Sequence, residues 1–219
     1  MTQPTFIIAD DHPLFRGAMR QALEGMGEAT AIIEAGDLDH ARKAAADHPD
    51  CDLILLDLTM PGVSGLSGLI AFRAEFASLP VVVVSATDDA TTIRRALELG
   101  ASGFISKSAS IEEIRTGVRT VLEGEVYTPA GIDLGAEHDP EIATLITRLN
   151  TLTPQQGRVL GMLAEGLLNK QIAYELSVSE ATIKAHVSAV LQKLGVDSRT
   201  QAVIQLQKIG AEILAGGDL

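Results

Sequence analysis

The sequence predicts an α/β protein in which a doubly wound, five-stranded parallel sheet is followed by a small all-α domain. Two observations predict the sheet. The first is a set of short runs that are apolar on both faces, which is typical of buried parallel strands. The second is that these runs alternate with segments of helical periodicity. A third observation predicts the second domain, because the last 70 or so residues form four short amphipathic helices. We expect domain boundaries of 1–125 for the first domain, 126–148 for a linker that can hold a short helix, and 149–219 for the second domain.

The elements of the first domain follow one another in a regular order. Four of the five expected strands are apolar runs, at residues 6–9, 53–56, 81–84 and 103–106. Apolar residues at helical spacing predict the intervening helices, near residues 14–26, 38–47, 65–76, 91–99 and 111–123. Gly100 is placed to stop the fourth of these helices. After Gly124 the periodicity is lost, which indicates the linker.

Polar side chains follow the apolar runs at the points where the strands are expected to end. They are Asp10, Asp11, Asp57, Ser85 and Lys107. The carboxyl ends of parallel strands lie along one edge of a sheet, so these groups should converge where such sheets bind ligands. Three adjacent carboxylates repel one another and need a cation, and an all-oxygen ligand set favours Mg²⁺. Carboxylates, Mg²⁺ and a lysine are a recurring set for phosphoryl transfer, in which an aspartate can itself accept the phosphoryl group.

The C-terminal helices carry readable capping signals. Thr153 begins a capping box with proline at the first helical position, Asn169 is expected to cap the next helix, and Ser179 the third. A tight turn through 177–178 separates the second and third helices. The third helix is expected to bury Ile183, Val187, Val190, Leu191 and Leu194. That leaves Lys184, Ala185 and Ser188 facing outward, which is the arrangement of a helix-turn-helix.

The charge is unevenly distributed along the chain. The net charge is −12, and it all resides in residues 1–148, which hold 11 Lys+Arg and 23 Asp+Glu. Residues 149–219 are neutral, so contact with DNA must come from a local patch of the second domain. One cysteine, no signal-peptide pattern and no long apolar stretch lead us to expect a cytoplasmic protein that does not enter membranes.

The first domain resembles the receiver domain of two-component response regulators, which has a flavodoxin-like fold. The segments that carry the likeness are 10–16, 56–65, 84–86 and 103–107. The resemblance implies that Asp57 is the phosphoacceptor. It also implies that Mg²⁺ is bound by Asp10, Asp11, Asp57 and the backbone carbonyl of Thr59.

The same resemblance assigns the residues that sense the phosphoryl group. Ser85 corresponds to the hydroxyl that turns toward it, Lys107 to its cationic partner, and Phe104 to the aromatic side chain that moves with the hydroxyl. The family accepts serine at the first of these positions and phenylalanine at the last.

The second domain resembles the LuxR-type DNA-binding domain, and the whole chain resembles a NarL/FixJ-type response regulator. The segments that carry this likeness are 152–154, 163–166, 169–173, 179–186 and 193–199. The resemblance places the third helix in the major groove. The base-facing residues are then Lys184, Ala185 and Ser188, and the phosphate-facing residues are Lys170, Thr182 and Lys193. Because Ser188 stands where the family often has a basic residue and the domain is neutral overall, we expect few phosphate contacts, weak binding by a lone domain and a shallow salt dependence.

The implied partners are a sensor histidine kinase, double-stranded DNA and a second copy of the chain when phosphorylated. We therefore expect a phosphorylated transcription regulator and not an enzyme. Two alternatives stay open at this point. One is a DNA-binding regulator whose receiver serves only as a docking surface, and the other is a Mg²⁺-dependent phosphohydrolase, although Thr59 replaces its usual second acid. The histidines lack metal spacing, and we expect His12 to be a surface polar group.

Overall fold

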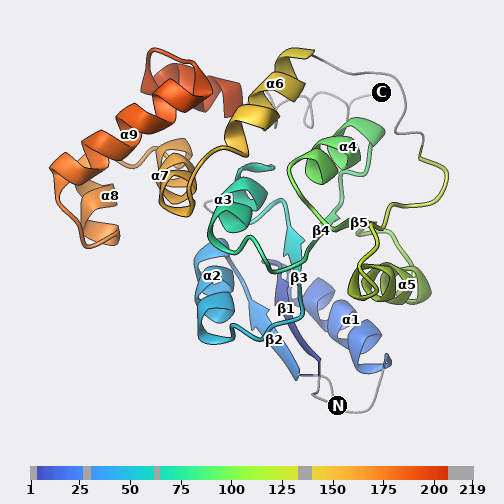
Figure 1. Cartoon of the computed structure of the whole chain (residues 1–219). Helices are drawn as coiled ribbons and strands as arrows, with labels where there is room; N and C mark the ends of the chain where they lie inside the picture. The colour runs from blue at the N-terminus through green and yellow to red at the C-terminus, as the bar shows by residue number, and fades with distance from the viewer. Residues whose placement is uncertain (1–3, 27–30, 62–64, 133–139, 207–219) are drawn as a thin grey trace. The chain divides into compact units, whose positions relative to one another are not determined.

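The computed structural model describes residues 4–26, 31–61, 65–132 and 140–206 (Figure 1). The chain divides into two compact units, residues 1–64 with 78–134, and residues 65–77 with 135–219. Expected features at Gly62, Asp139 and Ile209 lie outside the described residues, as do Ile213 and His138. The domain boundaries expected from the sequence stay a prediction.

A five-stranded sheet organises the first unit. Its strands are β1 (Thr5–Ala9), β2 (Ala31–Ala35), β3 (Leu53–Asp57), β4 (Val81–Ser85) and β5 (Gly103–Ser106). All neighbouring strands are parallel, in the order β2-β1-β3-β4-β5. This is the doubly wound arrangement that the sequence predicts, and its order reverses between β1 and β3, where such sheets place their ligands.

Five helices lie between or after the strands. They are α1 (Pro13–Glu24), α2 (Leu38–Asp47), α3 (Ser67–Glu75), α4 (Ala90–Glu98) and α5 (Ile111–Leu122). Side-chain caps begin three of them: Asp37 accepts from the His40 amide, Asp89 from Thr91 and Thr92, and Ser110 forms a capping box with Glu113. Gly100 has a φ of +90°, so it ends the fourth helix as expected.

Alternation along the strands creates the core of the first unit. On one face of the sheet, strand residues pack with α1 and α5 in a single apolar cluster. The fully buried members of this cluster are Phe6, Ile8, Met19, Ala22, Leu23, Leu53, Leu55, Val82, Val84, Ile105 and Val118. Strand residues of the opposite parity are buried as well, so the sheet is covered on both faces. Burial on both faces fixes the register, and register decides which side chains reach the carboxyl edge.

The second unit carries the helix-turn-helix. Its helices are α6 (Pro140–Leu149), α7 (Pro154–Ala164), α8 (Asn169–Glu175) and α9 (Glu180–Leu194), and residues 199–206 are helical. Val159, Leu163, Ile172, Ala173 and Ile183 form its core with partly buried neighbours. The Thr153 capping box and the Ser179 cap are both present, as predicted.

Three local features differ from the sequence predictions or were missed. Asn169 is not the cap of α8, because Leu168 holds that position and the Gln171 side chain accepts its amide at 2.7 Å. β2 was not located, because it is an edge strand that is partly exposed. The expected linker begins with backbone pairing, since Tyr127 forms a bridge to Gly103 at the free edge of β5. Among the described residues, no helix combines the length and apolarity needed to cross a bilayer.

Two helical glycines give opposite predictions for stability. A Cβ at Gly117 would lie 2.8 Å from the Tyr127 ring, whereas a Cβ at Gly17 would meet nothing within 4 Å. We expect Gly117→Ala to lower the free energy of unfolding by about 1–3 kcal/mol through overpacking. Gly17→Ala should raise it by about 0.5–1 kcal/mol through helix propensity. Urea unfolding followed by circular dichroism measures both, and equal stabilisation by the two substitutions would contradict the packing described for Tyr127.

Candidate functional site

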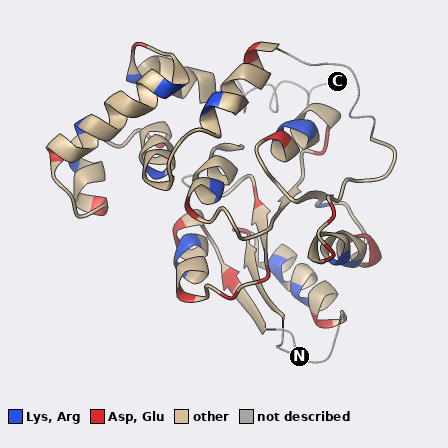
Figure 2. Ribbon diagram, in the orientation of Figure 1, with Lys and Arg blue, Asp and Glu red and all other residues tan. Residues whose placement is uncertain are grey.

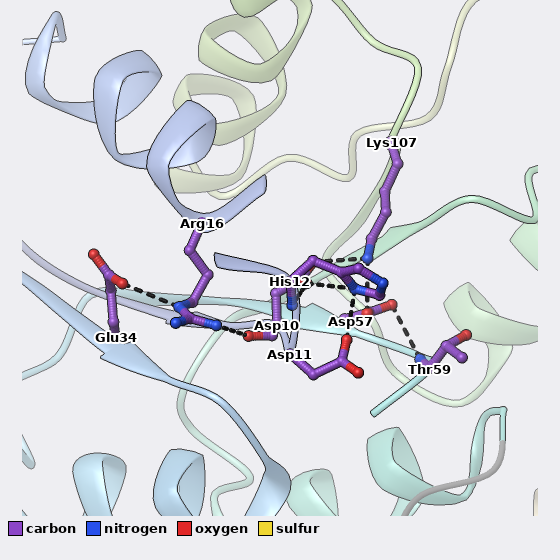
Figure 3. A network of polar contacts seen from close by, with 8 residues as sticks. All are labelled: Asp10, Asp11, His12, Arg16, Glu34, Asp57, Thr59 and Lys107. Atoms are coloured by element: carbon purple, nitrogen blue, oxygen red, sulfur yellow. Dashed lines mark hydrogen bonds and ion pairs between the residues drawn. The ribbon is translucent and has the colours of Figure 1, made fainter. Parts of the chain in front are cut away.

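The ends of three parallel strands form the candidate site. Asp10 follows β1, Asp57 ends β3 and Lys107 follows β5, so each reaches the carboxyl edge through its place in the sheet (Figure 3). Asp10 and Asp57 are almost completely buried, and Asp11 beside them is partly exposed. The structure thus brings together the acids that the sequence predicts at this edge.

The ammonium of Lys107 lies between two of these carboxylates. Its Nζ atom is 2.8 Å from Asp57 Oδ2 and 2.8 Å from Asp10 Oδ2. The Asp57 carboxylate also accepts the Thr59 amide at 3.0 Å, and Asp10 accepts the His12 amide at 2.7 Å. The Lys107 ammonium further lies 5.0 Å from the centroid of the Phe15 ring. Each buried carboxylate therefore has both a cationic partner and a backbone donor.

Burial and pairing act in opposite directions on the protonation of these groups. Burial raises the pKa of Asp57, and this exceeds the opposing effects of the Lys107 ammonium and the Thr59 amide. For Lys107, burial by itself lowers the pKa, but the bonds to Asp10 and Asp57 outweigh it and the pKa is raised. The contacts of Lys107 thus favour its cationic form, whereas burial disfavours the ionised form of the Asp57 carboxylate.

A divalent cation fits the charge and donors of this cluster. One oxygen from each of Asp10, Asp11 and Asp57 and one ring nitrogen of His12 lie within 4.8 Å of one another. Three carboxylates and one ammonium leave two negative charges, which a divalent ion would neutralise. Hard oxygen donors of this kind suit Mg²⁺. The backbone carbonyl of Thr59, also expected as a ligand, stays a prediction.

His12 contributes more to the site than the sequence analysis expected. Its side chain is 63% exposed, as befits a surface residue, but its Nδ1 atom lies 2.6 Å from Asp11 Oδ1 and 3.2 Å from Asp10 Oδ1. Its position directly after the two aspartates was the available signal. The spacing of the histidines along the sequence could not show this contact, because the partners of His12 are carboxylates and not other histidines.

The three expected switch residues lie on two neighbouring strands or directly after them: Ser85 ends β4, Phe104 lies in β5 and Lys107 follows β5. Ser85 is buried at the end of β4, and its backbone carbonyl accepts the Lys107 amide at 2.8 Å. Its hydroxyl accepts the Thr87 amide at 3.1 Å. Phe104 is fully buried in β5, and its amide donates to the Tyr127 carbonyl at 2.9 Å. The backbone around Ser85 and Lys107 is thus directly connected.

A cavity of about 480 Å³ opens beside Asp57. His12, Asp57, Thr59 and Lys107 are its polar lining residues, and Phe15 and Ala86 belong to its apolar lining. The cavity gives a small anionic group access to the Asp57 carboxylate while most of its wall excludes water.

The outward face of α9 carries the expected base-contacting residues. Lys184, Ala185 and Ser188 are all exposed, as predicted. Thr182, also exposed, is engaged at the start of the helix, where its amide donates to Ser179 Oγ at 3.1 Å. Lys184 forms an exposed ion pair with Glu180 at 3.1 Å, which is weak enough to be exchanged for another anion.

The other two expected phosphate contacts differ in their surroundings. Lys170 is exposed in the first turn of α8. The Lys193 ammonium instead donates to the Thr151 carbonyl at 2.7 Å and to Gln156 Oε1 at 2.8 Å, which ties α9 to the start of α7. Figure 2 shows Lys and Arg on several helices. Of the three lysines expected to contact DNA, Lys170 and Lys184 are exposed.

Comparison with known families agrees with both parts of the chain. The model of the response regulator receiver domain matches residues 6–119, and the model of the luxR family of bacterial regulatory proteins matches residues 150–206. The chain belongs to the LuxR-type response regulators. It is a response regulator with a receiver domain and a LuxR-type DNA-binding domain, and this family of DNA-binding transcription regulators points away from a free-standing enzyme.

Individual relatives extend over nearly the full chain of this response regulator. It is 43% identical over 204 residues to the glycerol metabolism activator of Pseudomonas putida, covering 90% of this chain and 92% of that protein. It is 35% identical over 215 residues to the nitrate/nitrite response regulator protein NarP of Escherichia coli K12, covering 94% and 96%.

A solved structure shows the same architecture. RcsB of Salmonella enterica serovar Typhimurium, bound to a promoter in the presence of the phosphomimetic BeF3⁻, is 26% identical to this response regulator with a TM-score of 0.52. The match covers 94% of this chain and 98% of that one.

The burial of Asp57 predicts a pH-dependent effect on stability. Because its pKa is raised on folding, its contribution to stability is present below the ordinary aspartate pKa of about 3.9 and is lost as pH rises through the folded value. Asp57→Asn should therefore raise the free energy of unfolding of the metal-free chain at neutral pH, by an amount that shrinks toward about pH 4. Lys107 keeps its contact with Asp10 in this variant.

Urea unfolding in the presence of a chelator, repeated across this pH range, provides the measurement. Asp50→Asn is the matched control, because Asp50 is exposed and carries no burial penalty. A gain in stability that is independent of pH, or a loss at neutral pH, would contradict the charge balance described here.

Proposed function

We propose that Asp57 is phosphorylated by a sensor histidine kinase with Mg²⁺ bound beside it, and that phosphorylation controls dimerisation and sequence-specific DNA binding. The observation that carries the proposal is the position of Lys107, whose ammonium lies 2.8 Å from Asp57 Oδ2 at the base of an accessible cavity. The family membership of both domains supports it.

The chemistry follows from the groups around Asp57. An Asp57 carboxylate oxygen attacks the phosphorus of a phosphohistidine, the new O–P bond forms as the P–N bond breaks, and the released imidazole takes up a proton. Asp10, Asp11 and Asp57 would hold Mg²⁺, which offsets charge on the equatorial phosphoryl oxygens. Lys107 would then donate a hydrogen bond to a phosphoryl oxygen in place of the carboxylate oxygen that it now contacts.

The same groups can report the new charge to the rest of the chain. Once Lys107 contacts a phosphoryl oxygen, the Ser85 hydroxyl can donate to the phosphoryl group while it still accepts the Thr87 amide, and this added bond draws the β4–α4 loop inward. The Phe104 side chain on β5 moves inward together with the Ser85 hydroxyl. This rearrangement alters the surface formed by the last strand and helices of the receiver, and the altered surface favours pairing of two copies.

Loss of the phosphoacceptor tests the first part of the proposal. Asp57→Ala should abolish labelling by a small acyl phosphate donor in the presence of Mg²⁺, because of the three clustered aspartates Asp57 is the one that lines the cavity. Phosphate-affinity gel electrophoresis and intact mass spectrometry measure the label, with Asp50→Ala as the control that keeps full labelling. Undiminished labelling of Asp57→Ala would refute the assignment, and sustained release of phosphate would favour a hydrolase.

The DNA-contacting face of α9 is tested separately. Lys184→Ala should weaken binding to an operator, obtained by selecting bound fragments, by about 1–3 kcal/mol if Lys184 contacts a base edge. Lys43→Ala removes an exposed lysine from α2 and should leave the affinity unchanged. Fluorescence anisotropy with and without the phosphodonor measures both. Affinity that does not respond to the phosphodonor would instead support a receiver that acts only as a docking surface.

A further inference from the structure

Arg16 on α1 connects the acidic end of β1 to the edge strand β2. Its Nη1 atom donates to the Asp10 backbone carbonyl at 2.6 Å, and its Nε atom donates to Glu34 Oε2 at 3.0 Å (Figure 3). The Arg16 side chain is 17% exposed, and its bond to the Asp10 carbonyl is partly buried, whereas its bond to Glu34 lies at the surface. A charged donor held in this way gives strong, directional hydrogen bonds.

The bond to the Asp10 carbonyl fixes the peptide that joins the two metal-site acids. The Asp10 amide continues the sheet by donating to the Ala35 carbonyl at 3.0 Å. Its carbonyl lies beyond the strand, and Arg16 supplies its partner. This carbonyl belongs to the planar peptide bond between Asp10 and Asp11, so the bond from Arg16 restrains the backbone from which the Asp11 side chain projects. Arg16 thus acts on Asp11 without contacting it.

Glu34 compensates the charge that Arg16 brings to the site. A bare guanidinium next to the acids would weaken their attraction for a metal cation. Glu34 is also bonded to Arg20, whose Nε atom lies 2.8 Å from Glu34 Oε1. Hydrogen bonds from Arg20 and Arg16 lower the pKa of Glu34, so that it remains ionised. Arg16 therefore holds the peptide between Asp10 and Asp11, while Glu34 offsets the positive charge that Arg16 brings to the metal site.

We infer that Arg16 is a positioning residue for the metal site, and that Glu34 neutralises it so that divalent-cation affinity is preserved. The inference rests on the proposed function, in which Asp10, Asp11 and Asp57 bind Mg²⁺. Partners that orient metal ligands commonly change metal affinity by about tenfold or more when removed.

Arg20 provides a matched control for Arg16. It lies one helical turn further along α1 and contacts the same glutamate, but its bonds go to Glu34 and Glu24 and not to the Asp10 carbonyl. Arg16→Gln and Arg20→Gln each remove one positive charge and one partner of Glu34. Only Arg16→Gln also removes the donor to Asp10.

Mg²⁺ binding to the full-length chain, measured by isothermal titration calorimetry, tests the inference. We expect Arg16→Gln to raise the Kd for Mg²⁺ about tenfold and Arg20→Gln to change it less than about twofold. Glu34→Gln leaves the arginine charge uncompensated, so its increase in Kd should diminish as ionic strength rises, whereas that of Arg16→Gln should persist. Electron paramagnetic resonance of bound Mn²⁺ supplies a second readout of the same site.

Three outcomes overturn the inference. They are an unchanged Kd for Arg16→Gln, an equal loss of affinity for Arg20→Gln, and an effect of Glu34→Gln that is insensitive to salt. If Arg16→Gln fails to fold by circular dichroism, Arg16→Lys replaces it, since it keeps the charge but lacks the planar donor pair, and it should still raise the Kd several-fold. A wild-type chain that binds no Mg²⁺ overturns the proposed function itself, which separates the two failures.

Discussion

The contact of one ammonium with two buried carboxylates supports the whole site. Lys107 reaches Asp10 and Asp57 from a different strand end, so β1, β3 and β5 must all be in register for the contact to form. Removing two carboxylates from water is unfavourable unless their charge is offset and their lone pairs are bonded. Lys107 and the amides of His12 and Thr59 meet these needs only in part, because with Asp11 beside them three carboxylates and one ammonium leave two negative charges. That residual charge is what makes the site receptive to a divalent cation and to a change of charge at Asp57.

β5 connects this site to the start of the expected linker within the first unit. Lys107 follows the strand, and its amide donates to the Ser85 carbonyl, while the Phe104 amide donates to the Tyr127 carbonyl. Tyr127 in turn packs against Gly103 and Gly117, where a side chain larger than hydrogen would collide with it. A displacement of Phe104 or Lys107 would therefore act on the backbone that leaves the receiver. The coupling requires no contact beyond those of β5 and its two neighbours.

Much of the fold and site could be predicted from the sequence, for identifiable physical reasons. Strands buried on both faces are continuous apolar runs, so β1, β3, β4 and β5 were located together with the polar residues at their ends. Thr153 and Ser179 were placed because capping depends on neighbours three residues away. β2 was not located because an exposed edge strand lacks the apolar signal. The contact of Arg16 with Glu34 joins residues that are distant in sequence, and it depends on the strand order, which local patterns do not encode.

The central claim is that Asp10, Asp11 and Asp57 form one cation site at the carboxyl edge of the sheet. Anomalous diffraction from crystals grown with Mn²⁺, a stand-in for Mg²⁺ that can be located by its own scattering, tests it most directly. The account predicts a single strong peak within bonding distance of oxygens from all three aspartates. A peak elsewhere, or aspartate side chains that point into separate environments around no peak, would contradict it.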